Sequence, residues 1–149
     1  MKNVFFRMAL IVLAATISLT FSTFAKAADM KMSSPKKMAP MTYSGYLADK
    51  LCADAGTAFD GTNMKTNPEN HTLKCLLAKQ CAASGFGLMM KDKDAKEYVF
   101  YKFDSKGDKL TKKLLAATKK QKDFFVEVVG TMDGKIIKVK SLKEATPKM

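Results

Sequence analysis

Histidine and arginine are almost absent from this 149-residue chain, which contains one residue of each, His71 and Arg7. A Ser-His-Asp triad would have to use His71, and no G-x-S-x-G nucleophile elbow accompanies it. The chain also lacks a C-x-x-C-H haem-attachment motif, a C-x-x-C redox motif and a phosphate-binding glycine loop. Because no motif of a known enzyme class is present, we expect a non-enzymatic protein.

The scarcity of arginine also bears on the partner implied by the net charge of +12. A charge of this size first suggests nucleic acid or another anionic surface. Specific contacts to phosphates and bases, however, favour the planar guanidinium group, and Arg7 lies close to the N-terminus. A surface rich in lysine is more typical of solubility and weak attraction to an anionic cell envelope. We therefore do not expect a nucleic-acid partner.

The first 27 residues have the pattern of an export signal. Lys2 and Arg7 precede an uncharged apolar run, and Ala25-Lys26-Ala27 supplies the small-x-small pattern of a cleavage site. The run is short for a transmembrane helix and contains several hydroxyl residues, so a retained membrane anchor is the weaker alternative. We expect cleavage after Ala27 and a periplasmic or secreted protein without stable membrane insertion, in a compartment where thiols oxidise.

The remaining sequence divides into a leader at residues 28–41, one domain at 42–143 and a C-terminal tail at 144–149. The leader is rich in Met, Lys and Pro and has almost no bulky aliphatic residue, so we expect it to be flexible. Its methionines offer thioether ligands that suit Cu⁺, although a polar linker that happens to contain methionine would look the same. These methionines are Met30, Met32, Met38 and Met41.

Hydrophobic alternation and turn signals within residues 42–143 predict five strands and two helices. The expected strands are residues 42–49, 86–91, 96–103, 123–131 and 135–142, and the expected helices are 67–85 and 108–119, with a loop at 52–65. Asp133-Gly134 predicts a tight hairpin between the last two strands. Five strands with a helix between the third and fourth are the layout of an OB-fold. We therefore predict a mainly β, α+β domain: a five-stranded OB-like barrel, with a further helix bearing Cys and His inserted between strands one and two.

Four residues in and near the inserted helix are candidate metal ligands: Cys52, His71, Cys75 and Cys81. His71 and Cys75 are four residues apart and would share one face of a helix. On a continuous helix Cys81 would point roughly 120° away from that face, and it would turn inward only if the helix loosened near Gln80. A Cys₃His set suits Zn²⁺ or Cu⁺. The pattern predicts a binding module for a soft metal ion.

A disulfide is the main alternative for three cysteines in an exported protein. Within a continuous helix the Cα atoms of Cys75 and Cys81 would be about 9 Å apart along the axis, which is beyond disulfide reach. A disulfide would therefore join Cys52 to one of them. The protein would then be a disulfide-stabilised envelope protein that binds a ligand or partner on the barrel face. A thiol-redox role for the odd cysteine is a third possibility.

The stretches GYLADKLC, HTLKC, CAASGFG and VEVVGTMDGKIIKVKSL together resemble a family of small, largely uncharacterised exported bacterial proteins. The family pattern is D-x-x-C, then H-T-x-x-C, then C-x-x-S-G and a closing V-x-G-x-x-x-G-x-x-I-x-V hairpin. The resemblance spans residues 44–142, implies an OB-like domain but no established activity, and carries over Asp49, Cys52, His71, Cys75 and Cys81. Several relatives space the last two cysteines four residues apart, whereas this chain spaces them six apart.

Overall fold

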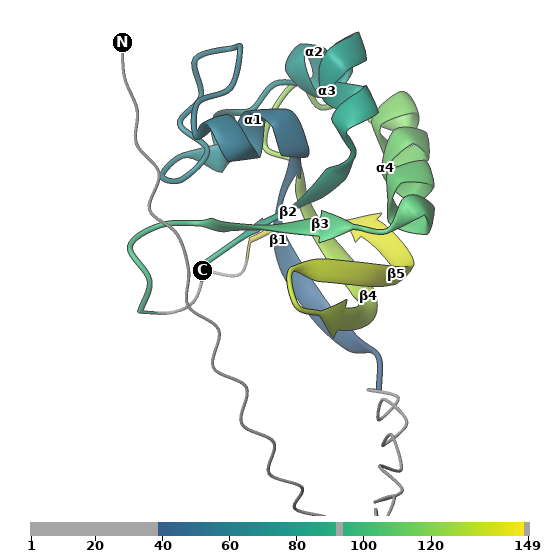
Figure 1. The fold of residues 1–149 in the computed structure, drawn as a ribbon. Coiled ribbons are helices and arrows are strands. Elements are labelled where there is room, and N and C mark those ends of the chain that lie inside the picture. The colour runs from purple at the N-terminus through teal and green to yellow at the C-terminus, as the bar shows by residue number, and fades with distance from the viewer. Residues whose placement is uncertain (1–38, 92–93, 148–149) are drawn as a thin grey trace, which may run out of the picture. The chain divides into compact units, whose positions relative to one another are not determined.

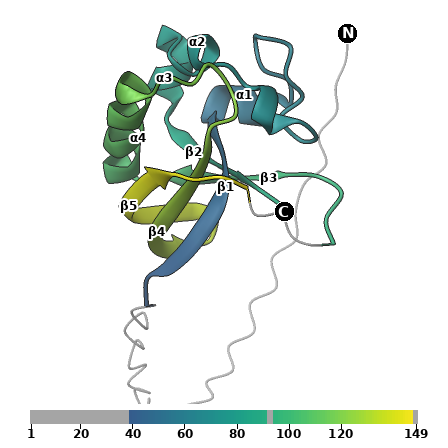
Figure 2. The same cartoon turned by 180° about the vertical axis from the view of Figure 1, so that it is seen from behind.

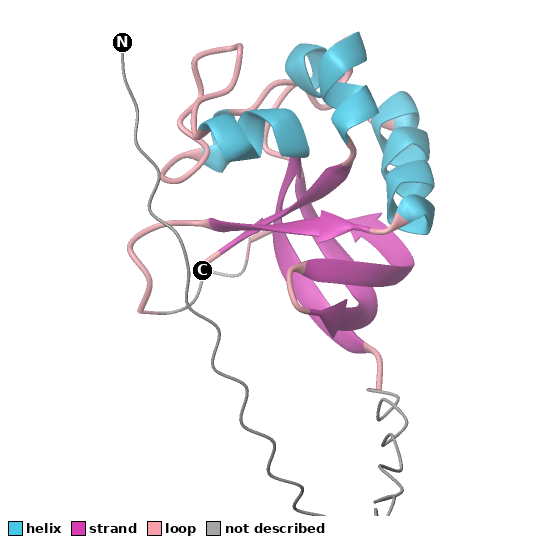
Figure 3. Cartoon of the chain, viewed as in Figure 1, coloured by secondary structure: helices cyan, strands magenta, loops and turns pink. Residues whose placement is uncertain are grey.

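The computed structural model describes residues 39–91 and 94–147, so the expected export signal and nearly all of the leader lie outside the described residues. The elements, in chain order, are β1 (Met41–Asp49), α1 (Lys50–Ala55), the 3-10 helix η1 (Pro68–Asn70), α2 (Leu73–Leu76), α3 (Lys79–Ser84), β2 (Phe86–Met90), β3 (Val99–Phe103), α4 (Ser105–Ala117), β4 (Phe125–Asp133) and β5 (Ile136–Glu144). Figure 1 shows their arrangement, and Figure 3 separates strands from helices by colour. Within the described residues, no helix has the length and apolar character needed to cross a membrane.

The five strands form one mixed sheet in the order β1-β2-β3-β5-β4, which closes into a barrel because β1 also pairs with β4. The β3–β5 pair is parallel and the other pairs are antiparallel. Two views from opposite sides show α1, α2 and α3 together at the end of the sheet where β1 ends and β2 begins (Figures 1 and 2). The prediction of a mainly β, α+β domain with five strands is confirmed.

The barrel interior is filled by aliphatic and aromatic side chains that alternate along the strands. In β4, Val126 and Val128 are buried, and in β5 the buried positions are Ile137 and Val139. Because side chains of a strand alternate between its two faces, such a pattern places one face in the core. Each fully buried aliphatic side chain contributes about 1.5–3 kcal/mol. The predicted hairpin is present: β4 ends at Asp133, β5 begins at Ile136, and the two residues between them form the turn.

The prediction of one helix over residues 67–85 is wrong. The segment contains η1, α2 and α3, with an extended residue at Thr72 and a second interruption at Ala78, whose ψ is 136°. Contacts to other parts of the chain compete with the helix here: the Leu73 N–H donates to the Gln121 carbonyl oxygen at 2.8 Å. Such tertiary contacts routinely override helix propensity.

Two helices begin at residues where the sequence had predicted no helix start, because an aspartate side chain caps the beginning of each. Residues 52–65 were expected to be a loop, yet α1 occupies the beginning of that segment because Asp49 caps it and accepts a hydrogen bond from the Cys52 N–H at 2.9 Å. Asp104 caps α4 in the same way, through the Gly107 N–H at 3.0 Å. Helix α4 therefore begins at Ser105, three residues before the predicted start. Aspartate is a strong N-cap residue as well as a turn residue.

Candidate metal centre

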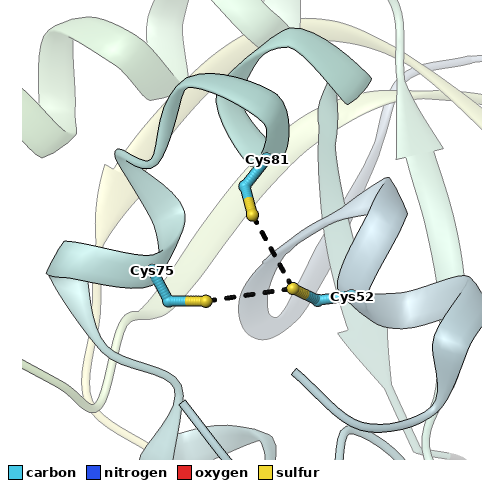
Figure 4. Close-up of side chains that lie close together, drawn as sticks. All are labelled: Cys52, Cys75 and Cys81. Carbon is cyan, nitrogen blue, oxygen red and sulfur yellow. Dashed lines mark hydrogen bonds between the residues drawn. The ribbon is translucent and has the colours of Figure 1, made fainter. Parts of the chain in front are cut away.

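Three cysteine side chains point toward one another where α1, α2 and α3 meet (Figure 4). Cys52 comes from α1, Cys75 from α2 and Cys81 from α3, and their exposed fractions are 1%, 6% and 0%. The Sγ atom of Cys52 lies 3.9 Å from the Sγ of Cys75 and 3.9 Å from that of Cys81. All three sulfur atoms lie within 4.8 Å of one another, and all three residues are free thiols.

Two of these cysteines are positioned by the same local device, a capping side chain three residues earlier. Asp49 receives the Cys52 N–H at the start of α1, and Thr72 receives the Cys75 N–H at the start of α2, at 3.3 Å. An N-cap fixes where a helix begins, so each cap also fixes the first-turn residue that carries the thiol. The D-x-x-C and T-x-x-C spacings were visible in the sequence and were not interpreted as caps.

Cys81 reaches the cluster because the chain breaks between α2 and α3. Leu77 ends α2 and Ala78 adopts an extended conformation before α3 begins. A straight helix would have pointed Cys81 about 120° away from Cys75. The loosening that was expected near Gln80 as a condition for a joint site therefore occurs two to three residues earlier, and it brings Cys81 against Cys52.

His71 lies beside this cluster, fully buried, and does not belong to a helix. Its Nε2 is 3.1 Å from Oδ2 of Asp49, and its Nδ1 is 3.1 Å from Oδ2 of Asp60. An ionised carboxylate can only accept hydrogen bonds, so both contacts are satisfied together when both ring nitrogens carry protons. In that form the imidazole has no lone pair for a metal ion. A ring nitrogen nevertheless lies within 4.8 Å of the thiols of Cys52 and Cys75, and the ligand role of His71 stays a prediction.

Asp60 is the residue of this region that sequence reasoning missed. Besides His71, it accepts the Thr72 N–H and the Thr72 hydroxyl, each at 2.8 Å, and the Thr62 N–H at 3.1 Å. Burial alone would raise the pKa of Asp60, but the hydrogen bonds from Thr72 and Thr62 outweigh it and hold the pKa well below the usual range. In the sequence, Asp60 is recognisable only as part of a D-G-T turn, and a turn does not indicate which residues the carboxylate will contact in the folded domain.

The Asp49 carboxylate is hydrogen-bonded both to the start of α1 and to the ring of His71. Burial would raise its pKa, but hydrogen bonds from the His71 ring and from Cys52 leave the pKa below the ordinary value. The Asp49 carboxylate is fully buried, and the Asp60 side chain is 15% exposed. Asp49, His71 and Asp60 thus form a hydrogen-bonded triad, in which Asp49 and His71 are buried and Asp60 is open to solvent, and which joins the end of β1 to the loop before η1 and to the start of α2.

Burial disfavours the thiolate form of two of these cysteines in the metal-free protein. Burial raises the pKa of Cys52 far above its ordinary value and raises the pKa of Cys81 to about 11. A soft metal ion binds the thiolate form and displaces the proton. Metal binding here would therefore release protons. The bound cation would balance the negative charge of the thiolates, which burial otherwise disfavours.

A pocket of about 260 Å³ opens beside Cys75. Its lining residues are Phe59, Asp60, Thr72, Lys74, Cys75, Ala78 and Gln80. Cys75 is the one cysteine of the three in this lining, and it is also the least buried of them. Cys75 is therefore the cysteine of the cluster that lies nearest to this opening.

Acid should destabilise the domain through Asp60. Because its folded-state pKa is lowered, its stabilising contribution is complete above the unfolded pKa near 4 and is lost as the pH falls from about 5 to about 2. We expect the free energy of unfolding to fall across that range through this group, by an amount that solvent around the exposed Asp60 reduces, and urea denaturation measures the fall. Asp60→Asn should be less stable at pH 7 and show a flatter pH dependence, whereas the exposed control Asp54→Asn should follow the parent. Parallel curves for Asp60→Asn and the parent protein would contradict the prediction.

No protein-family model matches the chain, and neither a curated protein nor a solved structure matches it significantly. The function is therefore argued from the geometry of the cluster and its surroundings.

Proposed function

We propose that this domain is a non-enzymatic binding module for a soft metal ion, Zn²⁺ or Cu⁺, held by the thiolates of Cys52, Cys75 and Cys81. The observation that carries the proposal is the 3.9 Å separation of Cys52 Sγ from both other sulfur atoms. Zn–S bonds of about 2.3 Å place the sulfurs of a tetrahedral site about 3.8 Å apart, whereas a disulfide bond is about 2.04 Å long. The sulfur atoms therefore have the spacing of thiolates that share one ion.

Two features of the surroundings support metal binding. The three ligands come from three short helices, so one ion would join three segments of the chain. The pocket at Cys75 gives an ion access without opening the barrel. His71, held by two carboxylates, acts in this proposal as a positioning residue: it fixes Asp49, which caps the helix that carries Cys52.

The wider setting is part of the same proposal. The strand order and the position of α4 between β3 and β4 support an OB-like barrel. The export signal expected at residues 1–27 supports a location in the periplasm or outside the cell. The resemblance to small exported bacterial proteins implies the same fold and the same location.

The direct test is a metal titration of the purified, reduced chain against a competing chelator. We expect one ion per chain and a decrease in affinity of at least 100-fold in Cys52→Ser, because Cys52 is the thiol nearest to both others. Ala55→Ser, an exposed change in the same helix, is the matched control and should bind as the parent does. Equal affinities of Cys52→Ser and the parent, or no binding by the parent, would rule out the proposal.

A thiol count separates this function from its main alternative. Cys52 is equally close to Cys75 and Cys81, so oxidation could join it to either of them. Three reactive thiols after removal of the metal fit the metal module, whereas one reactive thiol and a mass two daltons lower would indicate a disulfide-stabilised protein. In that case the barrel face would be the place to look for a ligand.

A further inference from the structure

The buried cluster around the thiols consists of sulfur-containing side chains and alanines. Its buried members are Ala48, Cys52, Ala58, Met64, Cys75, Cys81 and Met89. Met64 is fully buried and Met89 is 2% exposed. Every buried member larger than alanine therefore carries a sulfur atom.

The other buried cluster of the described domain has a different composition. It contains Leu, Phe, Val and Ile side chains, and no cysteine or methionine is among its buried members. Methionine and leucine have similar size and pack interchangeably in most cores at small cost. The gathering of all three cysteines and both fully buried methionines in one cluster is therefore a property of the site rather than of core packing in general.

We propose that the site is selective for Cu⁺ and that the thioether of Met64 or Met89 joins the cysteine thiolates as a ligand. This inference rests on the proposed function and names the ion and a further donor. Thioether sulfur is a soft ligand that Cu⁺ accepts readily, whereas protein sites for Zn²⁺ use cysteine sulfur, histidine nitrogen and carboxylate oxygen.

The nitrogen and oxygen side-chain donors that could give Zn²⁺ a fourth protein ligand are already hydrogen-bonded. Both nitrogens of His71 face carboxylates at 3.1 Å, and Asp60 also accepts hydrogen bonds from Thr72 and Thr62. Recruiting any of them as a ligand would break the hydrogen bonds of this triad. Cu⁺ does not require this, because it binds with soft sulfur donors alone.

The charges of the ligands and of the ion also favour Cu⁺. A thioether is neutral and needs no proton removed before it binds a metal. The hydrophobic members of the cluster are alanines, cysteines and methionines, and His71, which is buried beside them, already faces two carboxylates. A monovalent ion with one or two thiolates and a thioether leaves less uncompensated charge in the interior than further thiolates would, and buried uncompensated charge is costly.

The two methionines belong to segments other than the three helices that contain the cysteines. Met64 lies in the loop between α1 and η1, and its N–H donates to the Gly56 carbonyl oxygen at 2.9 Å, which folds the loop back over the end of α1. Met89 belongs to β2 and pairs with Tyr46 and Phe100. The helices thus supply the thiols, while the loop and the barrel supply the thioethers.

The test compares Cu⁺ and Zn²⁺ affinities in Met64→Leu, Met89→Leu and the double variant. Titrations use the purified full chain under anaerobic, reducing conditions, with a chromogenic Cu⁺ chelator and a Zn²⁺ chelator as competitors. We expect Cu⁺ affinity to fall at least 10-fold in one single variant and in the double variant, with Zn²⁺ affinity unchanged. Met132→Leu, a partly buried change that packs against the other cluster, is the control and should leave both affinities unchanged. Thermal unfolding of the metal-free variants checks that each one folds.

The outcomes separate this inference from the proposed function. Cu⁺ affinities equal to the parent in all methionine variants, with binding still lost in Cys52→Ser, would overturn the thioether ligand and leave the thiolate site in place. Equal losses of Cu⁺ and Zn²⁺ affinity in the folded methionine variants would assign them a packing role and also overturn it. Failure of the parent chain to bind either ion would overturn the proposed function itself.

Discussion

Replacing His71 with alanine is expected to lower the free energy of unfolding by about 3–5 kcal/mol. The His71 ring is fully buried between Asp49 and Asp60, whose pKa values are both lowered. Removing the ring leaves two carboxylates facing an empty space without their shared partner, and an unpaired buried charge is among the most costly defects in a protein interior. Urea denaturation of the metal-free chain at pH 7 measures the effect.

The control for His71→Ala is Asn70→Ala, which changes an exposed neighbour and should alter stability by no more than about 0.5 kcal/mol. A loss below about 1 kcal/mol in His71→Ala would mean that solvent reaches the Asp49 carboxylate, contrary to its burial. The size of the expected loss also affects how the metal site is tested. Loss of metal in His71→Ala could follow from unfolding alone, so the stoichiometry must be measured on the folded fraction. Retained binding there assigns His71 to positioning, and lost binding assigns it to the ligand set.

Gly87→Ala is expected to cost about 3 kcal/mol or more, at the upper end of overpacking effects. A Cβ at this position would lie 2.2 Å from the Tyr101 carbonyl oxygen and 2.6 Å from two ring atoms of Phe100. Because Gly87 pairs with Lys102 on β3 and with Ala48 on β1, the nearby backbone is held on both sides and cannot move away without opening the sheet. The same denaturation experiment reports the loss.

Gly61→Ala is the matched control for Gly87→Ala. Gly61 has a φ of 84° and no atom within 4 Å of an added Cβ, so the substitution introduces backbone strain without a collision. That strain is worth about 1–2 kcal/mol. If both alanine variants lose the same stability, the close approach of β2 and β3 at Gly87 is more tolerant than the sheet pairing indicates.

The strands could be predicted from the sequence because their signals are local. The alternation in KIIKVKSL and the Asp133-Gly134 turn depend on residues that are neighbours in the chain, and both are present in the structure. The break between α2 and α3 had no such signal. The segment from Leu73 to Ser84 is rich in good helix formers, and no glycine or proline marks Ala78 as the point of interruption.

The candidate site was predictable in its membership but not in its chemistry. The three predicted cysteines lie within 4.8 Å of one another, and His71 is grouped with Cys52 and with Cys75 within the same limit. The partners of His71 were not predictable, since Asp60 lies in an irregular loop and reaches the ring only in the folded structure. The position of Met64 and Met89 beside the thiols was not predictable either, because methionine in a sequence is first of all an apolar residue and the two lie far apart in the chain.

The closure of the barrel has a consequence for the order in which this protein assembles. β1 pairs with β4 near the other end of the domain, so joining them requires a long loop to close, and such non-local pairing is slow compared with local helix formation. The capped turns of α1 and α2 need only residues three apart, yet they meet only once β1 and β2 are paired. In the oxidising compartment that the expected export signal implies, the thiols of the folding chain would be exposed before the cluster exists. The speed of barrel closure would then set how long that exposure lasts, and with it the fraction of molecules that reach the native state with all three thiols intact.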